Sequence, residues 1–92
     1  MVLPLIWRSK ASADLLGIVE HIAQDSPVAA EALNDEITAR VSNLPDNPHA
    51  YRQGRVAGTR EMVVRPNYLV VYKVTDQAVT ILRVLHTARH WP

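Results

Sequence analysis

The sequence has no cysteine and no long apolar run among its 92 residues. The lack of cysteine excludes disulfides, thiol catalysis and cysteine-ligated metal sites, and it fits a cytoplasmic protein. Hydrophobic residues make up 48% of the chain, but no stretch approaches the roughly 18 consecutive apolar residues of a membrane span. The start MVLPLIWRSK soon reaches an arginine and has no small-residue cleavage pattern, so it predicts no secretory signal. The expected protein is one cytoplasmic domain, residues 1–92, without a membrane segment.

Sequence motifs for cofactor binding and nucleophilic catalysis are also missing. The chain contains no GxGxxG, no phosphate-cradling GxxxxGK and no serine elbow. Its four histidines lack a compact companion set of the HExxH kind. His86 and His90 have i, i+4 spacing but would share a face only if the chain were helical there. We therefore expect no metal, no cofactor and no nucleophilic hydrolase chemistry.

The charges are divided unevenly along the chain, although the net charge is only +1. Residues 1–46 carry three basic and seven acidic groups, whereas residues 47–92 carry seven basic and two acidic groups. Six of the seven cations in the second half are arginines, whose guanidinium grips phosphate or carboxylate bidentately. This half therefore suggests recognition of an anionic group, unless the two halves only attract each other or solvate separate faces.

Three runs rich in β-branched and aromatic residues fill the last third of the chain and predict strands: Thr59–Val64, Tyr68–Val74 and Val79–His86. The first two are separated by Arg65-Pro66-Asn67 and the last two by Thr75-Asp76-Gln77, both typical of turns. Connections this short join neighbouring antiparallel strands. A three-stranded meander is predicted.

The first half predicts a strand followed by two helices. Leu3–Arg8 resembles a short edge strand because of Pro4. Apolar residues at helical spacing predict a first helix from Ser9, as its cap, to Asp25. Gly17 within this helix indicates close packing against another helix, because glycine costs about 1 kcal/mol there.

The dipeptide Ser26-Pro27 predicts the cap and first turn of a second helix, which Pro45 ends. The short link favours an antiparallel helical hairpin. Pro45–Gly58 has no sustained period and is predicted to be a loop.

The predicted order is β-α-α-β-β-β. This order indicates an α+β fold of two layers, with the helical hairpin on one face of a mostly antiparallel four-stranded sheet. In the last strand, regular alternation would group Ile81, Arg83 and Leu85 on one face and Leu82, Val84 and His86 on the other. Both faces are then apolar. A chain of 92 residues has no second layer, so we expect a partly exposed apolar sheet face that binds a partner.

Arginine and histidine around the predicted sheet permit one kind of metal-free chemistry. Cleavage of RNA by its 2′-hydroxyl needs a proton acceptor, a proton donor and cations for the phosphorane. His86 could act as acid or base, since imidazole titrates near neutrality, and Arg60 and Arg83 could hold the phosphate. Alternatively, the arginines form salt bridges or solvated edges, and His86 only completes a sheet face.

The pattern GTRE-x-VV-x-x-x-Y-x-VVY-x-V at residues 58–74, followed by ILRVLH at 81–86, resembles the RelE/ParE superfamily of bacterial toxins. The early W-x-x-x-A-x-x-D-L at residues 7–15 is similar to the family's opening. The resemblance covers nearly the whole chain. It implies the toxin of a type II toxin-antitoxin, or plasmid stabilisation, module that inhibits growth until a cognate antitoxin blocks it. A heterotetramer is one form that such a complex takes.

The superfamily divides by target, and each branch implies different site residues. RelE-like members enter the ribosome and cut mRNA, which implies catalysis by Arg60, Arg83 and His86. ParE-like members inhibit DNA gyrase and generally lack that set. In either branch the remaining cations and the tail are candidates for contact with the target or with RNA: Arg52, Arg55, Arg65, Arg89, His90 and Trp91.

Two departures from the RelE-like pattern favour the ParE-like branch. The predicted loop before the strand Thr59–Val64 carries Arg52 and Arg55 in place of a lysine pair, and no tyrosine follows Tyr72 in the tail. The R-V-L-H ending at residues 83–86 also looks more like ParE. We therefore expect a gyrase inhibitor, with a metal-independent endoribonuclease as the alternative.

Overall fold

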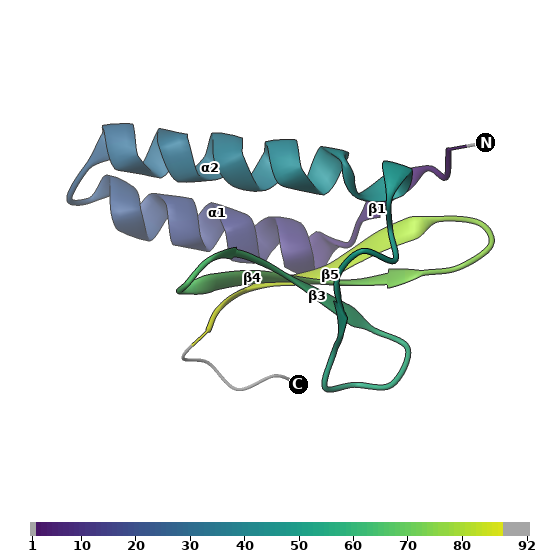
Figure 1. The fold of residues 1–92 in the computed structure, drawn as a ribbon. Helices are drawn as coiled ribbons and strands as arrows, with labels where there is room; N and C mark the ends of the chain where they lie inside the picture. The colour runs from purple at the N-terminus through teal and green to yellow at the C-terminus, as the bar shows by residue number, and fades with distance from the viewer. Residues whose placement is uncertain (1, 88–92) are drawn as a thin grey trace.

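A computed structural model of the chain describes residues 2–87. Two helices, α1 and α2, lie side by side and cover one face of a sheet (Figure 1). A short 3₁₀ helix, η1, follows α2. The elements are β1 (Leu5–Trp7), α1 (Ser9–Ala23), α2 (Pro27–Ser42), η1 (Leu44–Asp46), β2 (Arg52–Gln53), β3 (Arg60–Arg65), β4 (Tyr68–Val74) and β5 (Val79–His86).

The sheet has five strands in the order β1-β5-β4-β3-β2. The meander of β3, β4 and β5 is antiparallel throughout, and β1 joins its far edge parallel to β5 through Leu5↔Val79 to Trp7↔Ile81. The predicted α+β class, two layers and strand order are thereby confirmed. The predicted count of four strands is one short, because the two-residue strand β2 lies inside the segment predicted to be a loop.

The helical hairpin follows the two apolar stripes. Ser26 caps α2 by accepting a 3.1 Å hydrogen bond from the Ala29 N–H, as predicted. The predicted cap of α1 is wrong by one residue: Arg8 occupies the cap position, and Ser9 is already helical. Within the described part of the chain, neither helix is long and apolar enough to cross a membrane.

The main core lies between the hairpin and the sheet. Leu33, Ile37 and Val41 of α2 are fully buried against sheet residues such as Met62 and Tyr72. Ala11 and Leu15 add the inner face of α1 to this cluster. The predicted apolar stripe of each helix is therefore its buried face.

The opposite face of the sheet is buried at its centre and partly exposed around it. Leu69, Val71 and Leu85 form a second cluster there, with exposed fractions of 9%, 0% and 4%. Val63 pairs with Leu69 and is 39% exposed, and Ile6, whose strand neighbours face the main core, is 48% exposed. The expected partly exposed apolar sheet face is therefore present, although it is smaller than predicted.

A bulge in β5 changes which of its side chains share a face. Val71 pairs with Arg83, but the next residue, Tyr72, pairs with Ile81, so Leu82 is an extra residue. Ile81 and Val84 consequently both reach the main core, and Leu82 joins the second cluster with Leu85. The predicted regular alternation is wrong for this strand.

Gly17 does not lie at a helix crossing, contrary to the prediction. A Cβ built on it has no neighbouring atom within 4 Å. We expect Gly17→Ala to raise the free energy of unfolding by about 0.5–1 kcal/mol, because alanine loses less backbone entropy in a helix.

The matched control is Gly58→Ala. Gly58 also has open space around its Cα, but its φ of +83° strains any residue with a Cβ. Denaturant unfolding of the two variants should therefore give shifts of opposite sign. A loss of stability in Gly17→Ala would contradict the open environment.

Candidate functional site

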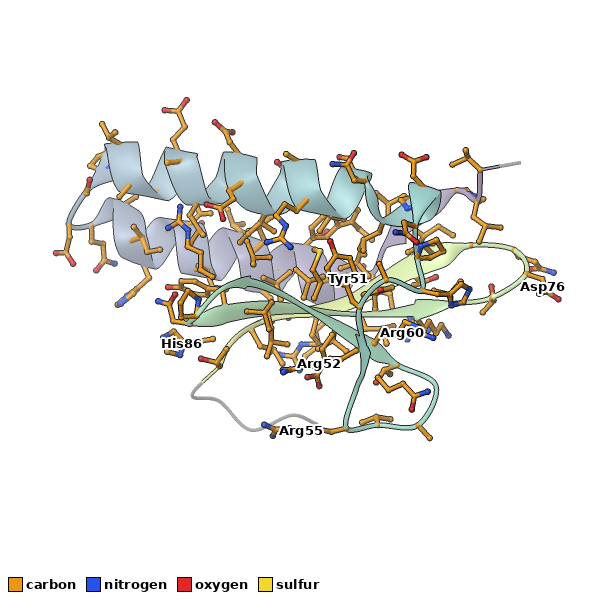
Figure 2. All side chains as sticks on the ribbon, viewed as in Figure 1. Tyr51, Arg52, Arg55, Arg60, Asp76 and His86 are labelled. Atoms are coloured by element: carbon orange, nitrogen blue, oxygen red, sulfur yellow. The ribbon has the colours of Figure 1, made fainter. Side chains whose placement is uncertain are left out.

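The three residues predicted for RNA cleavage do not converge. Arg60 pairs with Tyr72 near one end of β4, whereas His86 pairs with Tyr68 at the other. Tyr68 and Tyr72 are four residue steps apart on β4, which is roughly 13 Å along the sheet. Figure 2 shows Arg60 and His86 apart on the sheet.

Arg60 is bound to the segment that leads into β2. Its Nη1 donates to the carbonyl oxygens of Tyr51 at 2.7 Å and His49 at 3.4 Å. These carbonyls belong to an irregular stretch that needs donors. The guanidinium therefore holds the chain in place before β2.

Tyr72 secures the same stretch from inside the core. Its side chain is fully buried, and its hydroxyl donates a 2.6 Å hydrogen bond to the Pro48 carbonyl. Burial raises the pKa of Tyr72 to about 12, a rise that Arg60 opposes and Tyr51 slightly increases. The phenol is therefore a structural donor that stays protonated well above neutral pH.

This pKa predicts a loss of stability in alkali. Between pH 10 and about 12 the unfolded chain ionises this phenol while the folded chain keeps it protonated. Stability is therefore fully present below pH 10 and falls as pH rises, by roughly 2–3 kcal/mol in all. Denaturant unfolding from pH 8 to 12 measures this.

Tyr72→Phe provides the control for the alkaline loss. It should be less stable by about 1 kcal/mol at neutral pH, because the hydrogen bond to Pro48 is gone. It should also lose less stability in alkali than the unaltered protein. Parallel curves for the two proteins above pH 10 would refute the assignment.

Arg83 pairs with Asp14 on α1. Its Nε and Nη2 donate to the two carboxylate oxygens at 2.6 and 3.1 Å, and the side chains are only 21% and 15% exposed. These hydrogen bonds raise the pKa of Arg83 further. Asp14 also accepts a 3.1 Å hydrogen bond from the Val84 N–H. The pair thus fastens α1 to β5 just beyond the last residue that β1 covers.

His86 lies beside a cleft between α1 and the ends of β4 and β5. Its ring meets Tyr68 edge to face, with centroids 5.2 Å apart. The cleft has a volume of about 640 Å³, and its lining includes Asp14, Gly17 and His21. An imidazole and a phenol therefore line this cleft, and Arg60 does not.

A hairpin that joins β2 to β3 carries Arg52 and Arg55. It extends away from the helices, and Arg55 lies near its far end (Figures 1 and 2). Arg52 Nη2 lies 3.0 Å from Oε1 of Glu61. For Arg55, no side-chain hydrogen bond or ion pair forms with the rest of residues 2–87.

The other predicted contact residues divide between the fold and the end of the chain. Arg65 binds Glu36 of α2, with Nη2 and Oε1 2.7 Å apart. Arg89, His90 and Trp91 lie outside the described residues. Among residues 2–87, no three His, Cys, Asp or Glu side chains are placed to hold a metal ion.

Two of these arginines bind acidic residues, Glu61 and Asp14, that the sequence analysis did not select as site residues. Glu61 is 5% exposed and accepts a hydrogen bond from Arg52, and Asp14 accepts one from Arg83. A signal for both was present in the sequence: Glu61 begins the apolar run EMVV, and Asp14 lies beside the apolar stripe of the first helix. A buried acid needs a partner, and arginine was the available one.

The model of the family described as "ParE toxin of type II toxin-antitoxin system, parDE" matches residues 5–91. The chain belongs to this toxin family. It is 37% identical over 87 residues to Toxin RelE2 of Caulobacter vibrioides, with 92% of this chain and 96% of the relative covered. The protein is thus a type II toxin of the RelE/ParE superfamily, as the sequence resemblance implied.

Solved structures agree with the fold. The chromosomal ParDE system from P. aeruginosa superimposes with a TM-score of 0.82 and 27% identity, over 92% of this chain and 96% of that one. The E. coli DinJ-YafQ toxin-antitoxin complex superimposes with a TM-score of 0.66 and 18% identity, and the match covers 96% of each chain. At 18% identity the second likeness concerns the fold alone.

Proposed function

We propose that this toxin arrests growth by binding DNA gyrase and that it has no nuclease activity. The observation that carries this proposal is the engagement of Arg60 and Arg83 in structural contacts, Arg60 with backbone carbonyls and Arg83 with Asp14. Phosphoryl chemistry needs cations that are aimed at the developing charge. A protein target needs no such set. Gyrase as the target also implies a cytoplasmic toxin.

A cognate antitoxin is the second partner in this proposal. The structural neighbours include toxin-antitoxin complexes. The described surface exposes Leu16 at 58%, at a groove of about 510 Å³ between α1 and α2. Trp7, Leu15 and Val19 are among the residues that line this groove. An antitoxin that covers these side chains would remove apolar surface from water.

One observation favours a ribosome-dependent mRNA endoribonuclease as the alternative. His86 and Tyr68 stand together beside an open cleft, where an acid and a base could act on RNA. Arg83 lies on β5 as His86 does, although its guanidinium is hydrogen-bonded to Asp14. The alternative therefore requires Arg83 to leave Asp14 for a phosphate.

The test uses toxin released from its antitoxin complex. We expect it to inhibit supercoiling by purified gyrase, and we expect added antitoxin to relieve the inhibition. Mapping of transcript ends after induction in cells should give the same pattern as an uninduced control. New transcript ends together with undisturbed supercoiling would reject gyrase and favour the nuclease.

A further inference from the structure

The hairpin between β2 and β3 is held by a closed set of hydrogen bonds. Gly54 N–H donates to the Thr59 carbonyl at 2.8 Å. The Thr59 N–H and hydroxyl both donate to the Val56 carbonyl, at 3.1 and 2.6 Å. Gly58 takes a positive φ of 83° beside them. The segment 54–59 therefore has one well-defined shape rather than that of a loose loop.

Glu61 lies beneath this hairpin and binds both of its arginine residues. One carboxylate oxygen accepts from the Arg52 side chain at 3.0 Å, and the other accepts from the Arg55 backbone N–H at 3.3 Å. Gly54 permits the close fit, since an added Cβ would collide with the Thr59 hydroxyl and stand 3.4 Å from Glu61 Cγ. The buried carboxylate thus fixes the backbone from which the Arg55 side chain extends.

The two arginines of the hairpin consequently differ in what they can bind. Arg52 has its charge countered by Glu61, whereas Arg55 is tied only through its backbone and its side chain is exposed. A guanidinium on a fixed backbone loses less entropy on binding than one on a mobile loop. Of the two hairpin arginines, Arg55 is therefore the one whose guanidinium can bind an anion on another molecule.

We propose that Arg55 contacts a carboxylate on the target protein and that Glu61 is the positioning residue for it. This inference rests on gyrase, a protein, being the target. The other charges support a protein rather than a nucleic acid, because a polyanion is usually met by several cations along its backbone. Here four further arginines of the described chain are bound internally: Arg40, Arg60, Arg65 and Arg83.

Binding of purified gyrase by single variants tests the contact. We expect Arg55→Ala to weaken binding roughly 10- to 100-fold, since loss of one member of an interfacial charge pair leaves the other unpaired. Arg8→Ala is the matched control, because Arg8 is also exposed but lies between β1 and α1. It should bind within about twofold of the unaltered toxin.

A double-mutant cycle tests the positioning role of Glu61. Glu61→Ala should weaken gyrase binding although its side chain is buried, and Glu61→Ala/Arg55→Ala should be no weaker than Arg55→Ala alone. Hydrogen exchange at the Arg55 amide should quicken in Glu61→Ala. Glu61→Gln keeps an oxygen acceptor for that amide and should restore most of the binding.

Salt dependence separates a carboxylate partner from a phosphate backbone. A single ion pair predicts that log K falls with log salt with a slope near −1 or shallower, and that Arg55→Ala flattens it. RNA binding with a slope several times steeper, and no gyrase binding, would reject both this inference and the proposed target. Gyrase binding that is equal in Arg55→Ala and Arg8→Ala would reject the inference alone.

Discussion

Asp14→Ala is expected to lower the free energy of unfolding by about 2–4 kcal/mol. Asp14 accepts three hydrogen bonds, two from the Arg83 guanidinium and one from the Val84 N–H. Removing one member of a buried pair costs about 3–5 kcal/mol. The Asp14 and Arg83 side chains are 15% and 21% exposed. Water therefore screens part of their interaction, and the expected loss is smaller.

Denaturant unfolding of toxin freed from antitoxin measures this effect. Asp35→Ala is the control, because Asp35 is an exposed carboxylate of α2 whose side chain has no ion pair with another described residue. It should change stability by less than about 0.5 kcal/mol. If Asp14→Ala and Asp35→Ala unfold alike, the pair does not fasten α1 to the sheet.

The place of this pair follows from the short first strand. β1 pairs with β5 only as far as Ile81, and Arg8 N–H then binds the Ile81 carbonyl as the chain turns into α1. Asp14 meets the next part of the same edge through Val84. The Asp14 carboxylate thus accepts a backbone hydrogen bond from the part of β5 that β1 does not reach. It also covers a strand edge that could otherwise pair with another chain.

The meander was predictable because its signals are local. Alternating apolar residues and the turns at Pro66 and Asp76 fixed β4 and β5 at their observed bounds. β2 was missed because two residues show no period, and its pairing depends on the Gly54 turn. The bulge at Leu82 is set by packing on both sheet faces, which no local pattern reveals.

The candidate site was less predictable than the fold, because its partners are distant in sequence. Arg83 and Asp14 are 69 positions apart, so composition could show only that a cation within an apolar strand needs a partner. Arg60 likewise looked available, yet it binds carbonyls of a stretch that was predicted to be a loop. Sequence identified the arginines correctly as unusual but could not show that the fold itself uses them.

Removal of both charges from the pair at Asp14 and Arg83 should leave the toxin lethal. Asp14→Asn/Arg83→Gln keeps an oxygen for the Val84 N–H and most of the buried volume, and replacing both members of such a pair is often nearly neutral. We expect stability within about 1 kcal/mol of the unaltered toxin and full inhibition of gyrase. In a nuclease, the loss of a phosphate-holding arginine would cost some hundredfold in rate, or about 3 kcal/mol.

Arg83→Gln alone completes this comparison, because it leaves the Asp14 carboxylate without its cation. It should be less stable than the double variant, and its toxicity should fall only as far as its folded fraction does. Growth after induction, unfolding curves and supercoiling assays on the three proteins measure this. If the double variant were folded but harmless, Arg83 would act on the target directly, and its contact with Asp14 would be the resting state of a catalytic side chain.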